Sequence, residues 1–162
     1  MDNRSNQPYT PDLRGFIEYL DTVHPDQIIR ISKEVDPKFG VTGILDQLEK
    51  DGHFEAVIFE NVKGSNIPLV ANMHGHFARL RYAIGMEEGD EKAFLKEYAS
   101  LEANPIEPVM VEDAPVQEIV KTGDKINVDE LPICTYHELD AGRFITAGLG
   151  LMRDPDTGID NI

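Results

Sequence analysis

The residues best suited to chemistry by their types and spacing lie in the last part of the chain. Cys134 and His137 are three residues apart, and an imidazole beside a thiol can produce a nucleophilic thiolate. The spacing shows no third group that would orient the histidine, so a buried, unreactive thiol is the favoured interpretation. Glu138 and Asp140 could serve as an acid and a base on one face of an extended segment. Solvated loop charges explain these two carboxylates equally well.

A second group of candidates combines glycines with a threonine and an asparagine. Gly142, Gly148 and Gly150 accompany Thr146 in a segment that we expect to be a strand. Glycine in a strand marks either the close approach of a ligand or a bulge in the backbone, and both interpretations stay open here. Asn161 follows a turn signal, and its amide oxygen suits a hard cation such as Mg²⁺, Mn²⁺ or K⁺. Taken alone, this asparagine is a weak indication of a site.

A third candidate is the pair His74 and His76, which comes directly after an expected strand. Two imidazoles at this spacing can bind zinc or copper, but a metal site needs further ligands, and the neighbouring sequence supplies no Cys or His at ligand spacing. A loop that enters a helix through a polar cap is therefore favoured. The sequence also contains no glycine-rich phosphate-binding motif of the common nucleotide-binding kinds.

The composition limits the classes of partner. The 162 residues include 30 acidic and 15 basic side chains, for a formal net charge of −15, and no dense basic cluster. Nucleic acid is therefore an unsuitable partner, because its phosphates require such a cluster. The apolar runs are too short to cross a bilayer, and the N-terminus lacks the apolar core of a signal peptide. These features predict a soluble, cytoplasmic protein without a membrane partner. The single cysteine excludes an internal disulfide and agrees with a reducing compartment.

Residues 10–103 alternate between patterns typical of helices and of short strands. The first helix is expected to have Thr10 as its N-cap and Pro11 as its first residue, followed by an apolar stripe at helical spacing. The second helix is expected at 41–48, before Asp51 and Gly52 end it. Two further helices are expected at 76–84 and 91–101, and strands at 28–31, 56–59 and 68–71. Such alternation predicts an open α/β domain.

The composition changes after residue 103, where prolines become frequent. Segments rich in β-forming residues at 109–112, 117–121 and 144–152 predict a β domain, so we expect an N-terminal domain at 1–108 and a second one at 109–162. A turn signal at 154–158 predicts that residues 159–162 begin the returning strand of a hairpin. About fifty residues are too few for an independent barrel. Taking both parts together, the predicted fold class is α/β, or α+β.

The order of these segments resembles the N-terminal part of the UbiD family of reversible decarboxylases, which use prenylated FMN. The matching pieces are residues 12–17, 29–31 with 34–37, 59–64, and the long run from 131 to 148. They occur in the family's order and together extend along nearly the whole chain.

This resemblance implies an α/β domain followed by the first strands of a split β-barrel related to flavin reductases. It implies that Thr146 hydrogen-bonds the flavin, that Asn161 ligates a Mn²⁺ ion bridging to the flavin phosphate, and that the backbone carbonyl of Ile162 contacts K⁺. The other metal ligands and the catalytic Glu-Arg-Glu set would lie beyond Ile162, so no catalytic residue is expected within the chain. Full-length members of the family would form homo-oligomers.

Two functional hypotheses follow. The first is the N-terminal part of a decarboxylase that removes CO₂ from an aromatic carboxylate, of hydroxybenzoate type, or from an α,β-unsaturated acid. By itself this chain would then be inactive and would bind prenylated FMN weakly, and exposed barrel edges would promote its association. The alternative is a binding or regulatory subunit, or a fragment that assembles with a separate catalytic piece and has no chemistry of its own.

Overall fold

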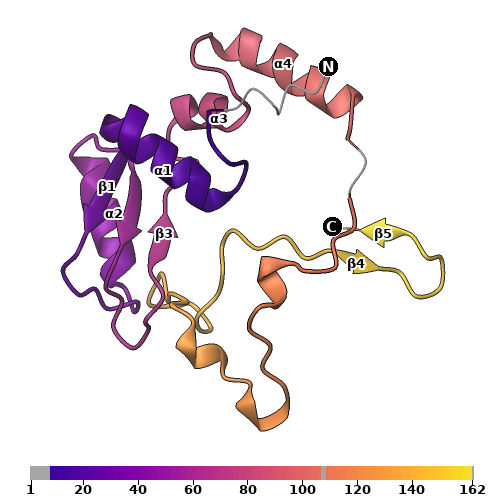
Figure 1. Cartoon of the computed structure of the whole chain (residues 1–162). Coiled ribbons are helices and arrows are strands. Elements are labelled where there is room, and N and C mark those ends of the chain that lie inside the picture. Colours follow the sequence, from indigo (N-terminus) through magenta and orange to yellow (C-terminus); the bar gives the residue numbers. More distant parts are fainter. Residues whose placement is uncertain (1–7, 107–108, 162) are drawn as a thin grey trace.

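The computed structural model describes residues 8–106 and 109–161. Figure 1 shows two parts: an α/β region of residues 8–103, which packs helices around a small sheet, and a C-terminal region of residues 109–161. The C-terminal region winds around an open space and ends in a hairpin that lies apart from the sheet. The mixture of helices with a small mixed sheet confirms the predicted α/β class.

Helix α1 extends over Leu13–Val23 and begins two residues later than predicted. Its N-cap is Asp12, whose side chain accepts a hydrogen bond of 2.8 Å from the backbone N–H of Gly15. The prediction of Thr10 as the cap and Pro11 as the first helical residue was wrong, because a carboxylate closer to the apolar stripe satisfies the free N–H groups of the first turn. The helix buries Tyr19 and Leu20 against the rest of the α/β region.

The sheet has the strand order β1-β2-β3. Strands β1 (Ile28–Ile31) and β2 (Ala56–Phe59) are parallel, and α2 (Gly40–Lys50) connects them. Strand β3 (Leu69–Ala71) is antiparallel to β2. All four residues of β2 are buried because the strand is central and covered on both faces, whereas β3 at the edge is half-buried. These strands and α2 agree with the sequence patterns to within one or two residues.

Two more helices complete the α/β region, α3 (Phe77–Ala83) and α4 (Glu91–Ala103). Asp90 caps α4 by accepting a hydrogen bond of 2.9 Å from the N–H of Ala93. Helix α4 has no buried residue, and its ring contact with α3 joins Phe94 to Phe77 at 5.2 Å between centroids. It is therefore the most loosely packed helix of this region. Along the described residues, no helix is long and apolar enough to cross a membrane.

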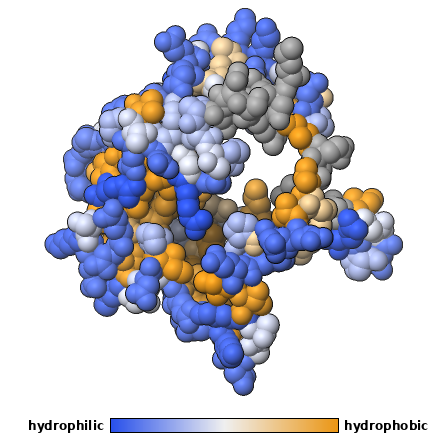
Figure 2. All heavy atoms as spheres, viewed as in Figure 1, coloured by the Kyte–Doolittle hydropathy of each residue, from blue (hydrophilic) through white to orange (hydrophobic). Residues whose placement is uncertain are grey.

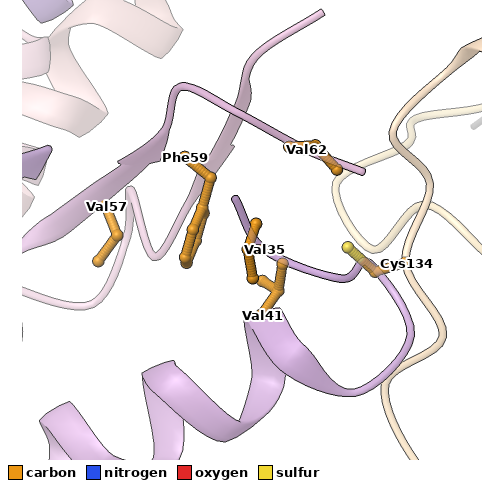
Figure 3. Close-up of a cluster of buried hydrophobic side chains, with 6 residues drawn as sticks. All are labelled: Val35, Val41, Val57, Phe59, Val62 and Cys134. Atoms are coloured by element: carbon orange, nitrogen blue, oxygen red, sulfur yellow. The ribbon is translucent and has the colours of Figure 1, made fainter. Parts of the chain in front are cut away.

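The buried side chains of the α/β region form two clusters. One lies under α1 and α3 and includes Tyr19, Leu20, Ala78 and Tyr82. The other lies between α2 and the sheet, and Figure 3 shows its members: Val35, Val41, Val57, Phe59, Val62 and Cys134. Its last member belongs to the C-terminal region, so this core draws on both regions of the chain.

The C-terminal region has much less regular structure than its sequence suggests. Residues 109–112, 117–121 and 144–151 contain no strand, so these three strand predictions were wrong. A strand needs a hydrogen-bonded neighbour, and the described residues pair none with these segments. The regular elements here are the short 3-10 helices η3 (Pro115–Gln117), η4 (Gly123–Lys125) and η5 (Val128–Glu130) and the strands β4 (Met152–Arg153) and β5 (Asp160–Asn161). One further 3-10 helix, η2 (Pro25–Gln27), precedes β1.

The hairpin of β4 and β5 confirms the predicted turn and returning strand. The carboxylate of Asp154 accepts hydrogen bonds of 2.7 Å from the N–H of Asp156 and 3.0 Å from that of Thr157. These bonds lower the pKa of Asp154, because they favour its charged form. Gly158 has a φ of 71°, in the left-handed region that glycine adopts without strain. The chain then returns with Asn161 opposite Met152.

Candidate functional site

The strongest candidate site is a cavity of about 960 Å³ that opens between the sheet and the C-terminal region. Pockets for small molecules and cofactors are usually between about 300 and 1,000 Å³, so its size suits a large organic ligand. Its lining residues are mainly apolar, and Figure 2 shows hydrophobic residues gathered around the hollow beside the α/β region. The lining consists of Val41, Leu45, Tyr136 and residues 68–75, 131–134 and 144–149.

The α/β region supplies one wall of this cavity. Val41 and Leu45 contribute from α2, where their spacing of four residues places them on the same helical face. The loop after β3 contributes Asn72, which has a φ of 57° and donates from Nδ2 to the carbonyl oxygens of Phe54 at 3.2 Å and Glu55 at 3.0 Å. These two bonds hold the asparagine in the left-handed conformation.

A buried arginine holds the loop after β3 in place through hydrogen bonds. Arg79, on α3, is 1% exposed. Its guanidinium donates to the carbonyl oxygens of Met73 at 3.0 Å, Asn72 at 2.9 Å and Phe54 at 2.6 Å. Burial lowers the pKa of Arg79, which nevertheless remains charged because an arginine starts from a very high value. Sequence reasoning missed this residue, since a single arginine within a helix gives no sign of which side it faces.

The opposite wall comes from the C-terminal region and contains Thr146. Thr146 lies in a turn, so the prediction that it lies on a strand was wrong. Its side chain nevertheless belongs to a residue that lines the cavity. The hydroxyl groups of Thr146 and Tyr136 are 3.5 Å apart. The ring of Tyr136 is 5.0 Å from the ring of Phe144, and the N–H of Phe144 donates to the carbonyl oxygen of Cys134 at 3.2 Å. Tyr136 is a second site residue that sequence reasoning missed.

Asp140 shapes this wall through the backbone. Its carboxylate accepts hydrogen bonds from the N–H of Tyr136 at 3.1 Å and of His137 at 2.8 Å. Residues 137–140 therefore form a turn, and the prediction that Glu138 and Asp140 share one face of an extended segment was wrong. A short acidic side chain can close a turn in this way, which competes with the extended conformation. The geometry gives Asp140 a structural role.

Cys134 is an unreactive core residue. It is 1% exposed, and burial raises the pKa of its thiol. Its neighbours in the cluster are the apolar side chains of Val35, Val41 and Val62. Because a thiolate would be unstable there, Cys134 is unsuited to act as a nucleophile, which confirms the interpretation of a buried thiol. His137 is exposed and provides no burial or orientation for such chemistry.

The histidine pair also has a structural explanation. His76 is the N-cap of α3, and its Nδ1 accepts a hydrogen bond of 3.3 Å from the N–H of Ala78. The predicted polar cap is thus confirmed. His74 is exposed at the rim of the cavity. Within residues 8–106 and 109–161, no group of three or more His, Cys, Asp or Glu side chains could hold a metal ion.

The two predicted metal contacts stay predictions. The backbone of Asn161 lies on β5, and Ile162 lies outside the described residues. At Gly142 and Gly150 an added side chain would meet nothing within 4 Å, and at Gly148 the nearest atoms belong to Ile145 at 3.9 Å. Close packing within the described chain therefore does not explain these glycines.

Comparison with protein families identifies both regions. A family model described as the 3-octaprenyl-4-hydroxybenzoate carboxy-lyase N-terminal domain matches residues 23–99. A second model, the Rift-related domain of the same carboxy-lyase, matches residues 108–162. An uncharacterized protein of Synechocystis sp. is 31% identical over 172 residues, which cover 93% of this chain and 34% of that protein. The chain thus spans about a third of the length of this relative.

Solved structures give the same result. An evolved dimeric form of the UbiD-class enzyme HmfF from Pelotomaculum thermopropionicum, in complex with prFMN, matches with a TM-score of 0.80 and 31% identity. That match covers 94% of this chain and 34% of HmfF. The vanillic acid decarboxylase of Sedimentibacter hydroxybenzoicus, in an open form with a truncated subunit, matches with a TM-score of 0.73 and 30% identity over 83% of this chain and 30% of the matched chain. Both matched domains and both structures point the same way, and the chain belongs to the UbiD family.

Proposed function

We propose that this chain is the N-terminal part of a UbiD-type decarboxylase that binds prenylated FMN and acts on an aromatic or α,β-unsaturated carboxylic acid. The observation that carries the proposal is the position of Thr146, which lines a largely apolar cavity of about 960 Å³. The chain belongs to a family in which HmfF has been solved with prFMN. Apolar surface for a ring system combined with a few polar groups is a lining that suits a flavin.

The residues present fit the flavin part of this proposal. The aromatic rings of Tyr136 and Phe144 and the aliphatic side chain of Leu45 lie in the cavity lining and offer contacts for a planar ring. The hydroxyl of Thr146 can donate one hydrogen bond to it. When bound, the cofactor would supply an electron sink for the loss of CO₂, and the protein would supply its orientation. Gly148 also lies in this lining, and the nearest atoms to an added side chain there belong to Ile145 at 3.9 Å.

The metal part of the proposal rests on fewer residues. Asn161 would provide an amide oxygen to Mn²⁺, and the carbonyl of Ile162 would contact K⁺, both by analogy with the family. Oxygen ligands of this kind suit hard cations. By the same analogy with the family, the other metal ligands and the catalytic set are proposed to lie outside residues 1–162.

The division into two domains, at 1–108 and 109–162, is also proposed. The separate family matches at residues 23–99 and 108–162 support it. The second domain would contribute the first strands of a split β-barrel, whose remaining strands would pair with the segments that have no strand partner here. A cytoplasmic location, a homo-oligomer of the complete enzyme and a carboxylate of small size as substrate complete the proposal.

Flavin binding tests this proposal directly. We would titrate the chain with prenylated FMN in the presence of Mn²⁺ and follow flavin fluorescence. Thr146→Val keeps the shape of the side chain but removes the hydroxyl, so affinity should fall by about three- to tenfold, as expected for one lost hydrogen bond. Thr122→Val is the matched control, because Thr122 makes no side-chain cap bond and is not among the cavity-lining residues. Equal affinities of the two variants would contradict the role of Thr146.

Catalysis by the chain alone tests where the catalytic groups lie, and flavin binding separates the two functional hypotheses. A chain that lacks the catalytic set should release no CO₂ from hydroxybenzoate-type acids, even with prenylated FMN and Mn²⁺ bound. Substantial CO₂ release by residues 1–162 would contradict the proposed location of the catalytic groups. If the chain binds no flavin in the titration, the alternative of a subunit without its own cofactor becomes the better explanation.

A further inference from the structure

A short segment of the C-terminal region is built into the α/β region. We call residues 130–136 the strap. The N–H of Phe39 donates to the carbonyl oxygen of Thr135 at 3.0 Å, and the N–H of Thr135 donates to that of Pro37 at 3.2 Å. These two bonds form an isolated parallel bridge between Lys38 and Thr135. A third link joins the hydroxyl of Ser65 to the carbonyl oxygen of Glu130 at 2.7 Å.

The strap also completes the core beneath it. Cys134 is 1% exposed and packs with Val41 of α2 and with Val35 and Val62, which follow β1 and β2. Figure 3 shows its side chain directed toward these valines from a separate part of the chain. In contrast, Val109, Val116 and other apolar residues before the strap are largely exposed. Among the described residues, the strap is therefore where the C-terminal region enters the core.

The strap continues directly into the wall of the cavity. The carbonyl oxygen of Cys134 accepts the N–H of Phe144, and Tyr136 meets the ring of Phe144 and the hydroxyl of Thr146. A displacement of the strap would therefore move the residues around Thr146. The α/β region, which provides the bonds to the strap, does not need to touch a ligand in order to influence its binding.

We propose that the strap makes the α/β region the support of the cavity wall, so that docking of the strap and binding in the cavity are coupled. Coupling of this kind is reciprocal. A change that undocks the strap lowers the affinity of the cavity for its ligand, and a bound ligand stabilises the docked strap. The part of this inference that concerns a flavin rests on the proposed function. The docking itself rests on the hydrogen bonds and the burial of the strap.

The chain offers a clean probe, because Cys134 is its single cysteine and lies in the strap. We would measure how fast a thiol-reactive disulfide reagent labels Cys134, with far-UV circular dichroism as the check that the helices remain folded. In the unaltered chain the thiol should react at least about a hundredfold more slowly than in the denatured chain, since labelling requires the strap to open. A thiol that reacts as in the denatured chain while the helices are intact would overturn the proposal.

Two variants weaken the docking selectively. Thr135→Pro removes the N–H that donates to Pro37, and labelling should become about five- to tenfold faster, as expected for the loss of one backbone hydrogen bond. Val120→Pro is the matched control, because Val120 lies in an exposed, irregular stretch of the same region, and its labelling rate should not change. If Thr135→Pro loses its helices, Ser65→Ala replaces it and should speed labelling severalfold. Equal rates in the folded variant and its control would overturn the docking.

Flavin titration of the same variants tests the coupling. Thr135→Pro, or Ser65→Ala in its place, should bind prenylated FMN several times more weakly than Val120→Pro. Equal affinities would overturn the coupling. If none of the proteins binds flavin, the proposed function is contradicted, and the labelling rates alone decide whether the strap is docked. The two failures can therefore be distinguished.

Discussion

Similar apolar residues are buried in the α/β region of this chain and exposed in its C-terminal region. Strand β2 contains Val57 and Ile58 and is completely buried, whereas Val109 is 84% exposed and Ile119 is 77% exposed. All four are β-forming, apolar residues in short runs. The difference is that β2 has a hydrogen-bonded neighbour on each side and a helix over it, while residues 109–121 have none within the described chain. Apolar content alone therefore does not make a core.

The strap shows what changes the outcome. Cys134 belongs to the same C-terminal region as Val109, but it is buried because the backbone of residues 37–39 pairs with its neighbour Thr135. A segment becomes part of a core when another segment satisfies its backbone groups. Where the C-terminal region lacks such a partner, its exposed apolar residues are expected to promote association.

The largest effect should come from deleting a core side chain. Phe59 is fully buried in the cluster between α2 and the sheet, so Phe59→Ala should lower the free energy of unfolding by about 3–5 kcal/mol. Val109→Ala removes an exposed side chain and should change it by less than about 0.5 kcal/mol. Urea denaturation followed by circular dichroism measures both. Comparable losses in the two variants would contradict the contrast between the regions.

The two regions also contain arginines of different kinds. Arg79 is buried and donates to the carbonyl oxygens of Phe54, Asn72 and Met73, and its replacement by alanine removes all three of these hydrogen bonds. We expect Arg79→Ala to lower the free energy of unfolding by about 2–4 kcal/mol. Arg143 pairs with Asp129 on the surface, and Arg143→Ala should have an effect below about 1 kcal/mol. A larger loss at Arg143 would show that the C-terminal region is more tightly held than its exposure suggests.

A smaller and local effect is expected at Asp140. Asp140→Ala removes the acceptor of the N–H groups of Tyr136 and His137, at an expected local cost of about 1 kcal/mol. Hydrogen exchange should therefore become about fivefold faster at these two amides. Asp140→Asn keeps an acceptor oxygen and should retain most of the protection, and the exposed neighbour Glu138 provides a second control through Glu138→Ala. Unchanged exchange in Asp140→Ala would argue against the turn.

The smallest effect concerns pH. Burial raises the pKa of Cys134 in the folded chain above its value in the unfolded chain. The folded state then keeps its proton when the unfolded state has lost it, so stability is complete below the unfolded pKa, about 8.5, and falls as pH rises above it. Cys134→Ala should make the free energy of unfolding depend less steeply on pH above about 8.5. Urea titrations across this range measure the slope, and identical slopes would place the thiol in water.

Much of the α/β region could be predicted because its signals are local. The apolar spacing of α2 and the block of β2 act over a few residues, and each element appears where the pattern places it. A polar cap at the start of α3 was foreseen in the same way, although the predicted helix included the capping residue His76 itself. The wrong N-cap of α1 shows the limit of such reasoning, since Thr10 and Asp12 are both good caps and only the course of the chain selects between them.

The candidate site could be predicted only in part. Thr146 was named through a family resemblance and does line the cavity, but on a turn instead of a strand. Tyr136, Arg79 and the strap were not foreseen, because each depends on a partner distant in sequence: Arg79 reaches back to Phe54, and Thr135 pairs with residues 37–39. The roles of Asn161 and Ile162 in metal binding stay predictions.

The sequence by itself determined the helices, the three strands of the sheet and the hairpin, because hydrogen bonds and apolar contacts between near neighbours set them. It also contained enough of the family's motifs to indicate UbiD. Only the tertiary structure decided that Cys134 is a core residue, that Asp140 closes a turn, and that the α/β region supports the wall around Thr146. The physical reason is that burial and hydrogen bonding at these positions depend on segments far along the chain, which local patterns do not encode.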